Sequence, residues 1–182
     1  MVITDSDKEQ LLALARQALE ARVTGSRAPD VICTGCLALR CGAFVSIHCG
    51  EDLRGCLGRL TVDAPLGKTI VHLGGAVAES DPRFLPVTAD ELATLHIEIS
   101  LLTPERPINS IDDIEVGRHG LIVEHGYARG LLLPQVASEQ GWNRETFVEH
   151  TCIKAGLPRD AWKNGARILV FDAHVFAEAP RG

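Results

Sequence analysis

The sequence predicts an α+β protein built on antiparallel strands and hairpins flanked by helices. Segments with apolar residues at helical spacing are interspersed with pairs of short alternating segments joined by turns, the pattern of hairpins. The regular alternation of strand and helix that a doubly wound parallel sheet requires is absent. With 182 residues, 46% of them hydrophobic, the chain is long enough for one sizeable core or for two lobes that share a boundary.

The N-terminal segment is expected to form an amphipathic helix over residues 6–23. Ser6 and Glu9 form a capping-box pattern at its start, and leucine, alanine and valine recur at helical spacing after them. Residues 43–49 alternate as a strand, and a short polar turn leads into a second strand over residues 53–60. These two strands predict an antiparallel hairpin.

A second helix is predicted over residues 65–79, with Pro65 in its first turn. The consecutive glycines Gly74 and Gly75 each lower helix stability by about 1 kcal/mol relative to alanine. Their presence therefore indicates close packing against another backbone, for which the hairpin is our candidate.

A half-buried strand is predicted over residues 95–101, after a turn that Thr88 and Glu91 are expected to cap. The remaining chain predicts a helical turn at residues 111–114 and a second hairpin formed by residues 119–124 and 130–133. Two helices are predicted over residues 135–139 and 144–155, and a closing strand over residues 168–176.

Composition and charge exclude several classes of protein. The formal net charge of −6 leaves no basic stripe for a phosphate backbone, so we expect no nucleic-acid partner. The first residues lack the basic and apolar regions of a secretory leader, and no apolar run approaches the roughly 20 residues of a membrane span. We therefore expect a cytoplasmic protein with no membrane partner. The common nucleotide-binding, zinc-protease and serine-hydrolase motifs are absent, so the sequence identifies no cofactor.

The six cysteines raise the question of a metal or redox site. Cys33 and Cys36 form a C-x-x-C pair and Cys41 follows, which would suit a metal-binding regulator. The second C-x-x-C pair of a zinc ribbon is missing, and no βαβ context supports a redox pair. Because free cysteine is among the most buried residue types, we expect small buried side chains here and assign no metal site.

The most informative segment is the hexapeptide at residues 53–58, which reads Leu-Arg-Gly-Cys-Leu-Gly. In an extended strand Arg54, Cys56 and Gly58 share one face, and the Cα atoms of Arg54 and Cys56 lie roughly 6.5 Å apart. The guanidinium charge would then favour a thiolate, and the glycines leave open space beside the sulfur. This arrangement suits a nucleophile or an anion site, and it equally suits a tight strand crossing.

Further chemical candidates lie downstream of the hexapeptide. Arg83 follows Asp81 in an Asp-Pro-Arg-Phe sequence, where it is either an anion-binding group or a structural partner of Asp81 or of a carboxylate elsewhere. His96, Glu98 and Ser100 share one face of a strand and could act in acid/base work. A polar face on an antiparallel strand is, however, more often simply solvated.

Several segments, taken in order, resemble the AMMECR family, whose hallmark is a Leu-Arg-Gly-Cys-Ile-Gly hexapeptide; here Leu57 replaces Ile. The matching segments are residues 42–46, 53–58, 81–84, 98–100, 117–121, 133–136 and 154–157. The resemblance implies a single α+β domain over residues 1–182, with two unequal lobes, the smaller formed by central segments. It also implies a groove beside the hexapeptide strand, and a modification pathway shared with a Memo-like protein and a radical SAM enzyme.

Two functional hypotheses follow. In the first, the chain is an enzyme or ligand-processing domain in which Cys56 is the nucleophile or covalent attachment point for a small molecule. Arg54 activates the thiol or binds an anion, and backbone amides near Gly55 and Gly58 receive developing negative charge.

His119 is the expected base in this hypothesis, with His48 and His96 as alternatives. In the second hypothesis the same groove binds a small molecule, or docks a Memo-like or radical SAM protein, without chemistry. Arg54 and Arg83 then carry the affinity, and Cys56 is merely a small residue that fits. A homodimer is left open by both hypotheses.

Overall fold

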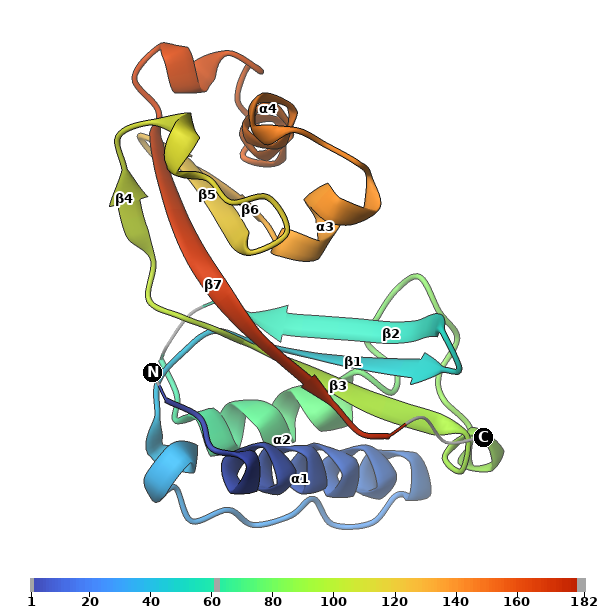
Figure 1. Ribbon diagram of the computed structural model, residues 1–182. Coiled ribbons are helices and arrows are strands. Elements are labelled where there is room, and N and C mark those ends of the chain that lie inside the picture. Colours follow the sequence, from blue (N-terminus) through green and yellow to red (C-terminus); the bar gives the residue numbers. More distant parts are fainter. Residues whose placement is uncertain (1, 61–62, 180–182) are drawn as a thin grey trace. The chain divides into compact units, whose positions relative to one another are not determined.

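The computed structural model describes residues 2–60 and 63–179, and it confirms the α+β class. Within these residues the chain forms four α-helices and seven strands, with short 3₁₀ turns between them (Figure 1). The chain divides into two compact units. Unit 1 comprises residues 1–101 and 174–182, and unit 2 comprises residues 102–173.

Unit 1 packs two helices against one face of an antiparallel sheet, in which the last residues of β7 (Arg167–Ala177) lie beside β3 (Figure 1). Its elements are α1 (Asp5–Thr24), β1 (Ala43–Cys49), β2 (Asp52–Arg59), α2 (Leu66–Ala76) and β3 (Leu95–Leu102). Strand β1 is central, paired with β2 on one side and β3 on the other, so the predicted hairpin is confirmed. Leu11, Leu19, Val45, Ile70 and Ile97 are fully buried in the core between helices and sheet.

Helix α1 begins at a capping box formed by Thr4 and Asp7, whereas the sequence predicted Ser6 and Glu9. The Thr4 side chain accepts the Asp7 N–H, and the Asp7 carboxylate accepts the Thr4 N–H at 2.9 Å. Both pairs have the three-residue spacing of a capping box, so spacing alone does not separate them. Gly25 ends the helix in the left-handed conformation, with φ of 70°.

Helix α2 packs so closely against α1 at Gly74 that a side chain at this position would collide with the α1 backbone. A Cβ atom built on Gly74 would lie 2.8 Å from the carbonyl oxygen of Ala15. The glycine therefore permits close backbone packing, as predicted, but its partner is α1 and not the hairpin. The helix is also shorter than predicted and ends at Ala76.

Unit 2 contains the second predicted hairpin, a strand that was not predicted, and two helices. Its elements are β4 (Arg106–Ile108), β5 (His119–His125), β6 (Ala128–Leu132), α3 (Pro134–Glu139), α4 (Arg144–Lys154) and the first part of β7 (Arg167–Ala177). Strand β7 pairs with β4 on one side and β5 on the other, and β5 also pairs with β6, all antiparallel. Pro107 obscured β4 in the sequence, because proline is confined largely to edge strands.

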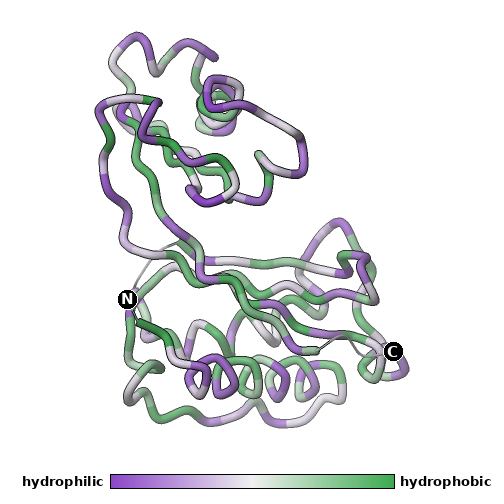
Figure 2. Tube along the Cα trace, viewed as in Figure 1, coloured by the Kyte–Doolittle hydropathy of each residue, from purple (hydrophilic) through white to green (hydrophobic). Residues whose placement is uncertain are grey.

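The core of unit 2 lies between this sheet and α4. Phe147 and Val148 of α4 are fully buried against Val123 and Val170 of the sheet. Figure 2 shows hydrophobic and hydrophilic residues alternating along α1, as a helix with one buried face requires. Among the residues that the structure describes, no helix combines the length and the apolar character needed to cross a membrane.

Candidate functional site

The sheet of unit 1 has a polar face, and Cys56 lies on it. Along β1, Val45 and Ile47 are fully buried in the core, whereas Ser46 and His48 alternate onto the opposite, half-buried side. Neighbouring strands add side chains in register. We call this surface the polar face, defined by Ser46, His48, Cys56, His96, Glu98 and Ser100.

A thiol, a hydroxyl and a carboxylate form one row across the polar face. Ser46 of β1 lies directly opposite Cys56 of β2 and directly opposite Glu98 of β3. Side chains at directly opposed positions have Cβ atoms about 4.5–5.5 Å apart. The central Ser46 hydroxyl therefore lies between the Cys56 thiol and the Glu98 carboxylate.

Arg54 is directed away from this row by an irregularity in β2. Ile47 pairs with Gly55 and His48 pairs with Leu53, so Arg54 has no partner across the strand pair. One extra residue in a strand is a β-bulge, and it breaks the alternation of side chains. The prediction that Arg54 and Cys56 share a face through strict alternation did not allow for this bulge.

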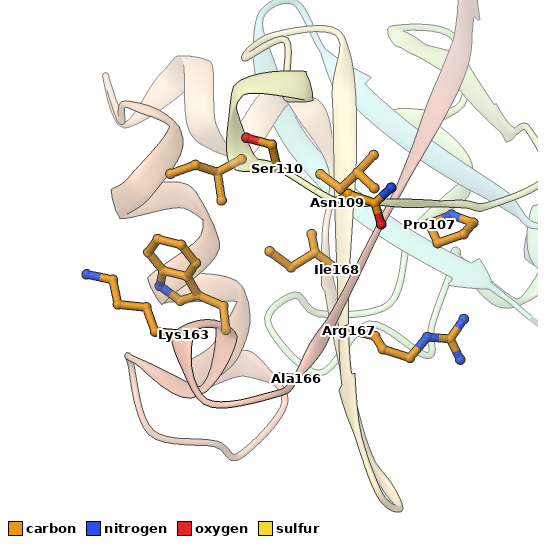
Figure 3. Close-up of a pocket in the computed structure, with 10 residues that line it drawn as sticks. Pro107, Asn109, Ser110, Lys163, Ala166, Arg167 and Ile168 are labelled. Atoms are coloured by element: carbon orange, nitrogen blue, oxygen red, sulfur yellow. The ribbon is translucent and has the colours of Figure 1, made fainter.

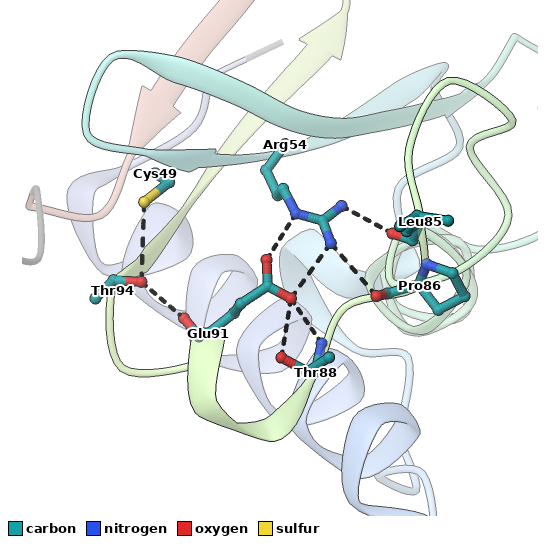
Figure 4. Close-up of polar contacts among 7 residues, drawn as sticks. All are labelled: Cys49, Arg54, Leu85, Pro86, Thr88, Glu91 and Thr94. Atoms are coloured by element: carbon teal, nitrogen blue, oxygen red, sulfur yellow. Dashed lines mark hydrogen bonds and ion pairs between the residues drawn. The ribbon is translucent and has the colours of Figure 1, made fainter.

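The Arg54 guanidinium is engaged by a carboxylate and two carbonyls (Figure 4). Its Nε and Nη2 donate to the two oxygens of Glu91 at 2.7 and 3.3 Å, and Nη1 donates to the Leu85 carbonyl at 2.9 Å. Only 19% of the side chain is exposed. The guanidinium therefore connects β2 to the segment that precedes β3, and the activation of Cys56 by Arg54 stays a prediction.

Glu91 is fixed from a second side by the capping box that the sequence predicted. Its Oε2 accepts the Thr88 N–H at 2.8 Å and the Thr88 hydroxyl at 3.1 Å (Figure 4). The Arg54 guanidinium first, and then the Thr88 N–H, lower the pKa of the Glu91 carboxyl. Glu91 is thus an ionised structural anchor for Arg54.

Among the described residues, Arg83 is the cation whose charge lowers the pKa of Cys56. Its Nε and Nη2 donate to the two oxygens of Asp81 at 3.0 and 2.7 Å, the bidentate pair expected in the structural interpretation. Asp81 is buried, with 4% exposed, and its Oδ2 also accepts the Cys56 backbone N–H at 2.9 Å. The Arg83 guanidinium, chiefly, holds the pKa of Asp81 well below its usual range.

Arg83 keeps 57% of its side chain exposed while it pairs with Asp81. The guanidinium also lies over the Phe84 ring, 5.3 Å from the centroid. Because a guanidinium has five N–H donors, the ion pair with Asp81 leaves donors for a second anion. The structural and anion-binding interpretations of Arg83 are therefore compatible.

Burial is the main influence on the Cys56 thiol. Desolvation raises the pKa of Cys56 above its usual value, and the charges of Asp81 and Glu98 act in the same direction. A hydrogen bond from Ser46 and the charge of Arg83 lower the pKa of Cys56, but their effect is smaller than that of burial. The thiol is therefore protonated at neutral pH and needs a base to become a nucleophile.

His48 and His96 form a stacked pair on the polar face. They lie opposite each other on β1 and β3, with ring centroids 5.3 Å apart and planes inclined by 19°. His48 Nε2 and His96 Nδ1 are buried and have no hydrogen-bond partner among the described residues. Desolvation lowers the pKa of His48 and outweighs the opposing charge of Glu98, while the neighbouring His96 lowers it further, so the ring is neutral at physiological pH.

His119, the predicted base, belongs to unit 2, whereas Cys56 belongs to unit 1. It is 1% exposed, its Nδ1 accepts the Glu115 N–H at 3.0 Å, and its Nε2 lies 3.1 Å from Arg106 Nη2. Both ring nitrogens are thus engaged within unit 2. Its role as base stays a prediction.

The two glycines of the hexapeptide have packing roles. A Cβ atom on Gly55 would lie 3.1 Å from the Val77 carbonyl oxygen, and one on Gly58 would lie 2.1–2.5 Å from ring atoms of Phe44. The open space predicted beside the sulfur is therefore filled by other groups at both positions. The backbone N–H between them, that of Cys56, already donates to Asp81.

The other cysteines that raised the question of a metal site are Cys33, Cys36 and Cys41. Cys36 and Cys41 are buried and Cys33 is half-buried, all as free thiols. Within residues 2–60 and 63–179, no group of three or more cysteine, histidine or carboxylate side chains is placed to hold a metal ion.

Comparison with known proteins gives one consistent family. A family model described as AMMECR1 matches residues 12–176. A protein of Methanosarcina acetivorans is 37% identical over 97% of this chain and 94% of its own length, and one of Thermofilum pendens is 40% identical over 94% and 90%. The crystal structure of the uncharacterized protein PH0010 from Pyrococcus horikoshii matches with a TM-score of 0.86 and 38% identity, over 98% of this chain and 95% of that one.

Proposed function

This chain belongs to the AMMECR1 family, and from the contacts of its cysteine we propose that the polar face binds a small molecule that Cys56 attacks covalently. The observation that carries the proposal is the row formed by Cys56, Ser46 and Glu98. The row contains a thiol, a hydroxyl and a carboxylate, and in our proposal the hydroxyl conducts the proton and the carboxylate is the base.

The attack needs a base, because burial keeps the Cys56 thiol protonated by raising its pKa. The sulfur forms a bond to an electrophilic carbonyl carbon, and the S–H proton passes through the Ser46 hydroxyl to the Glu98 carboxylate. The π electrons of the carbonyl group move onto its oxygen. The carbonyl oxygen becomes an anion, which exposed cationic donors can stabilise.

Arg83 supplies that cationic group. Its charge acts on Cys56, and more than half of its side chain is exposed although it pairs with Asp81. Asp81 holds the guanidinium in place through two hydrogen bonds, so its donors are preorganised for an anion. We therefore assign to Arg83 the anion-binding role, one of the two roles that its sequence context allowed.

Reaction with p-nitrophenyl acetate tests the proposal. Acetyl transfer forms a C–S bond to Cys56, breaks the ester C–O bond and releases p-nitrophenolate, which absorbs visible light. We expect stoichiometric acetylation at Cys56, located by peptide mass spectrometry, with the fully buried Cys152 unmodified as an internal control. Equal, negligible acetylation of both thiols would reject a nucleophilic role for Cys56.

A non-catalytic binding protein is the second candidate, favoured by the raised pKa of the Cys56 thiol. In this version the polar face holds a ligand through Arg83, and the thiol takes no part. Cys56→Ser would keep the affinity for a bound small molecule, whereas Arg83→Gln would weaken it. Loss of affinity on the cysteine substitution alone would count against this version.

The wider setting rests on the family resemblance and the sequence alone. We propose a cytoplasmic location, a groove beside β2 that admits the ligand, and a Memo-like or radical SAM protein as partner in a common pathway. Co-purification with a tagged copy of this chain tests whether such a partner binds. A tagged Arg83→Gln copy is the matched control bait. Failure to recover either class of protein would remove the partner and leave the Cys56 chemistry untouched.

A further inference from the structure

The backbone groups of β2 that point away from β1 form an outer edge of the sheet (Figure 1). In antiparallel pairing, residues whose N–H and C=O face the partner strand alternate with residues whose groups face away from it. The Cys56 N–H donates to Asp81, so the backbone groups of Cys56 face away from β1. Regular pairing from Cys56 to Gly58 gives Gly58 the same orientation. The outer edge therefore presents the Cys56 carbonyl and both backbone groups of Gly58.

The first half of this edge is closed by other groups. The bulge at Arg54 interrupts it, and the Arg54 guanidinium donates to the carbonyls of Leu85 and Pro86. The Asp81 carboxylate accepts the Cys56 N–H. Bulges and covering segments are the means by which proteins protect a sheet edge from pairing with another chain. In β2 these means protect the edge only as far as the Cys56 N–H.

The second half of the edge is open. Within residues 2–60 and 63–179, no group is hydrogen-bonded to the outward N–H or C=O of Gly58 or to the Cys56 carbonyl. Gly58 is exposed, and its exposed surface is backbone because glycine has no side chain. The Phe44 ring lies over one face of Gly58, so the open approach lies in the plane of the sheet. A glycine in a strand also lets a second backbone approach closely.

The open groups match an extended peptide. Along β2 they follow the order acceptor, donor, acceptor, and another extended backbone offers the complementary groups at the same spacing. A second copy of this chain fits less well, because the edge from Cys56 to Arg59 spans only about 10 Å. So short an edge contributes little of the roughly 1,200–2,000 Å² that a stable protein interface buries.

The cavity of unit 2 drawn in Figure 3 is a weaker candidate for a binding site. Lys163 and Arg167 are the charged residues that line it, and Glu145 and Glu124 already pair with them. The open groups of the β2 edge differ, because they have no partner in the part of the chain that the structure describes.

We propose that a short extended peptide adds to the open edge of β2 as an antiparallel strand. The peptide residue opposite Gly58 exchanges both backbone hydrogen bonds with it. The peptide residue opposite Cys56 donates its N–H to the Cys56 carbonyl. This binding needs no reaction at Cys56, so it goes beyond the function proposed above.

The faces of the sheet set the side chains that the peptide should carry. Side chains at directly opposed positions share a face, so the peptide side chain opposite Cys56 lies on the polar face beside the thiol. The peptide residue between the two hydrogen-bonded residues lies opposite Leu57 and points to the other face. Leu57 packs against the core of unit 1, so an apolar side chain is favoured at this position.

The peptide Thr-Thr-Val-Thr-Thr, acetylated and amidated at its ends, is the probe, and the backbone amide signals of the full-length protein are the readout. Its valine is placed opposite Leu57, between threonines opposite Gly58 and Cys56. We expect the peptide to move the Gly58 amide proton signal downfield and saturably, because the Gly58 N–H gains a carbonyl acceptor. The dissociation constant should be on the order of 1 mM. The amide of Gly141, an exposed glycine of unit 2, is the internal control.

N-methylation of the peptide separates edge pairing from other modes of binding. A methyl group on the nitrogen of the threonine opposite Gly58 removes the donor to the Gly58 carbonyl and blocks the approach to the edge. The affinity should then fall at least about tenfold. A methyl group on the valine nitrogen, which faces away from β2, should change the affinity less than about twofold.

The contrast is made in the peptide because a side chain at position 58 would displace the Phe44 ring. No shift of the Gly58 signal, or equal loss of affinity with the two methylated peptides, would overturn the proposal. A Gly58 signal that moves with protein concentration in the absence of peptide would assign the edge to a second copy of this chain, and would overturn it as well.

Discussion

The Cys56 backbone N–H donates to Asp81 Oδ2 at 2.9 Å, so the strand that carries the thiol is tied to the turn that carries Arg83. Asp81 accepts three further hydrogen bonds, all from Arg83, at 2.7–3.1 Å. One buried carboxylate therefore fixes the thiol and the cation that acts on it. The chemistry proposed for Cys56 depends on this arrangement.

Replacing Asp81 with asparagine should destabilise the protein. The amide keeps one acceptor but loses the charge that Arg83 pairs with, and we expect a loss of about 1–3 kcal/mol in the free energy of unfolding. The lower part of this range is favoured because the Arg83 side chain is 57% exposed. Urea denaturation measures the effect, and Asp5→Asn, which removes only an ion pair with Lys8 at a 92% exposed side chain, should lower the midpoint much less.

The contribution of Asp81 should disappear in acid. Its pKa is lowered in the folded protein, so its stabilisation is complete above the pKa of the unfolded chain and is lost as the pH falls through the folded pKa. The difference in stability between wild type and Asp81→Asn should therefore be largest near neutral pH and shrink in strong acid. A difference that grows as the pH falls would contradict this assignment.

Breaking the Arg54–Glu91 ion pair should lower the stability of the protein without changing the pKa of the Cys56 thiol. Arg54→Gln removes two hydrogen bonds to Glu91, and we expect a loss of about 1–3 kcal/mol in the free energy of unfolding. Arg118→Gln, which removes exposed ion pairs only, should cost less. If Arg118→Gln is the more damaging change, Arg54 does not anchor β2.

The pH dependence of Cys56 alkylation separates the two arginines. Burial raises the pKa of the thiol in the folded protein. The rate of Cys56 alkylation by iodoacetamide, plotted against pH, should therefore have its midpoint at a higher pH in the folded protein than in the urea-unfolded chain. Arg83→Gln should move the pKa of Cys56 further upward, because a cation that stabilises the thiolate is removed. Arg54→Gln should leave the pKa of Cys56 unchanged. A shift of this pKa with Arg54→Gln alone would show that Arg54, and not Arg83, activates the thiol.

Gly58→Ala should destabilise unit 1 through the Phe44 ring. The added methyl group would lie within 2.5 Å of three ring atoms, so the ring must move, at a cost of about 1–3 kcal/mol in the free energy of unfolding. In a Phe44→Leu background the same change should cost less. Equal costs in both backgrounds would show that the glycine is needed for another reason.

The sequence predicted the elements better than it predicted the site. Alternation and caps were sufficient for the first hairpin and the Thr88–Glu91 turn, because both are local. The bulge at Arg54 depends on register against β1, which a strand read alone does not reveal. The spacing of Asp81 and Arg83 allowed their ion pair as one of two interpretations, but the bond from Cys56 to Asp81 spans 25 residues and follows from tertiary packing.

The rate of Cys56 acetylation by p-nitrophenyl acetate in Glu98→Gln tests the central claim most directly. The negative charge of Glu98 raises the pKa of Cys56, so a purely electrostatic role predicts more thiolate and a faster reaction when that charge is removed. A general base predicts the opposite, since glutamine cannot accept the proton. At about pH 7 we expect a decrease of at least tenfold relative to wild type, within the range usual for loss of a general base. An unchanged or faster reaction would contradict the account.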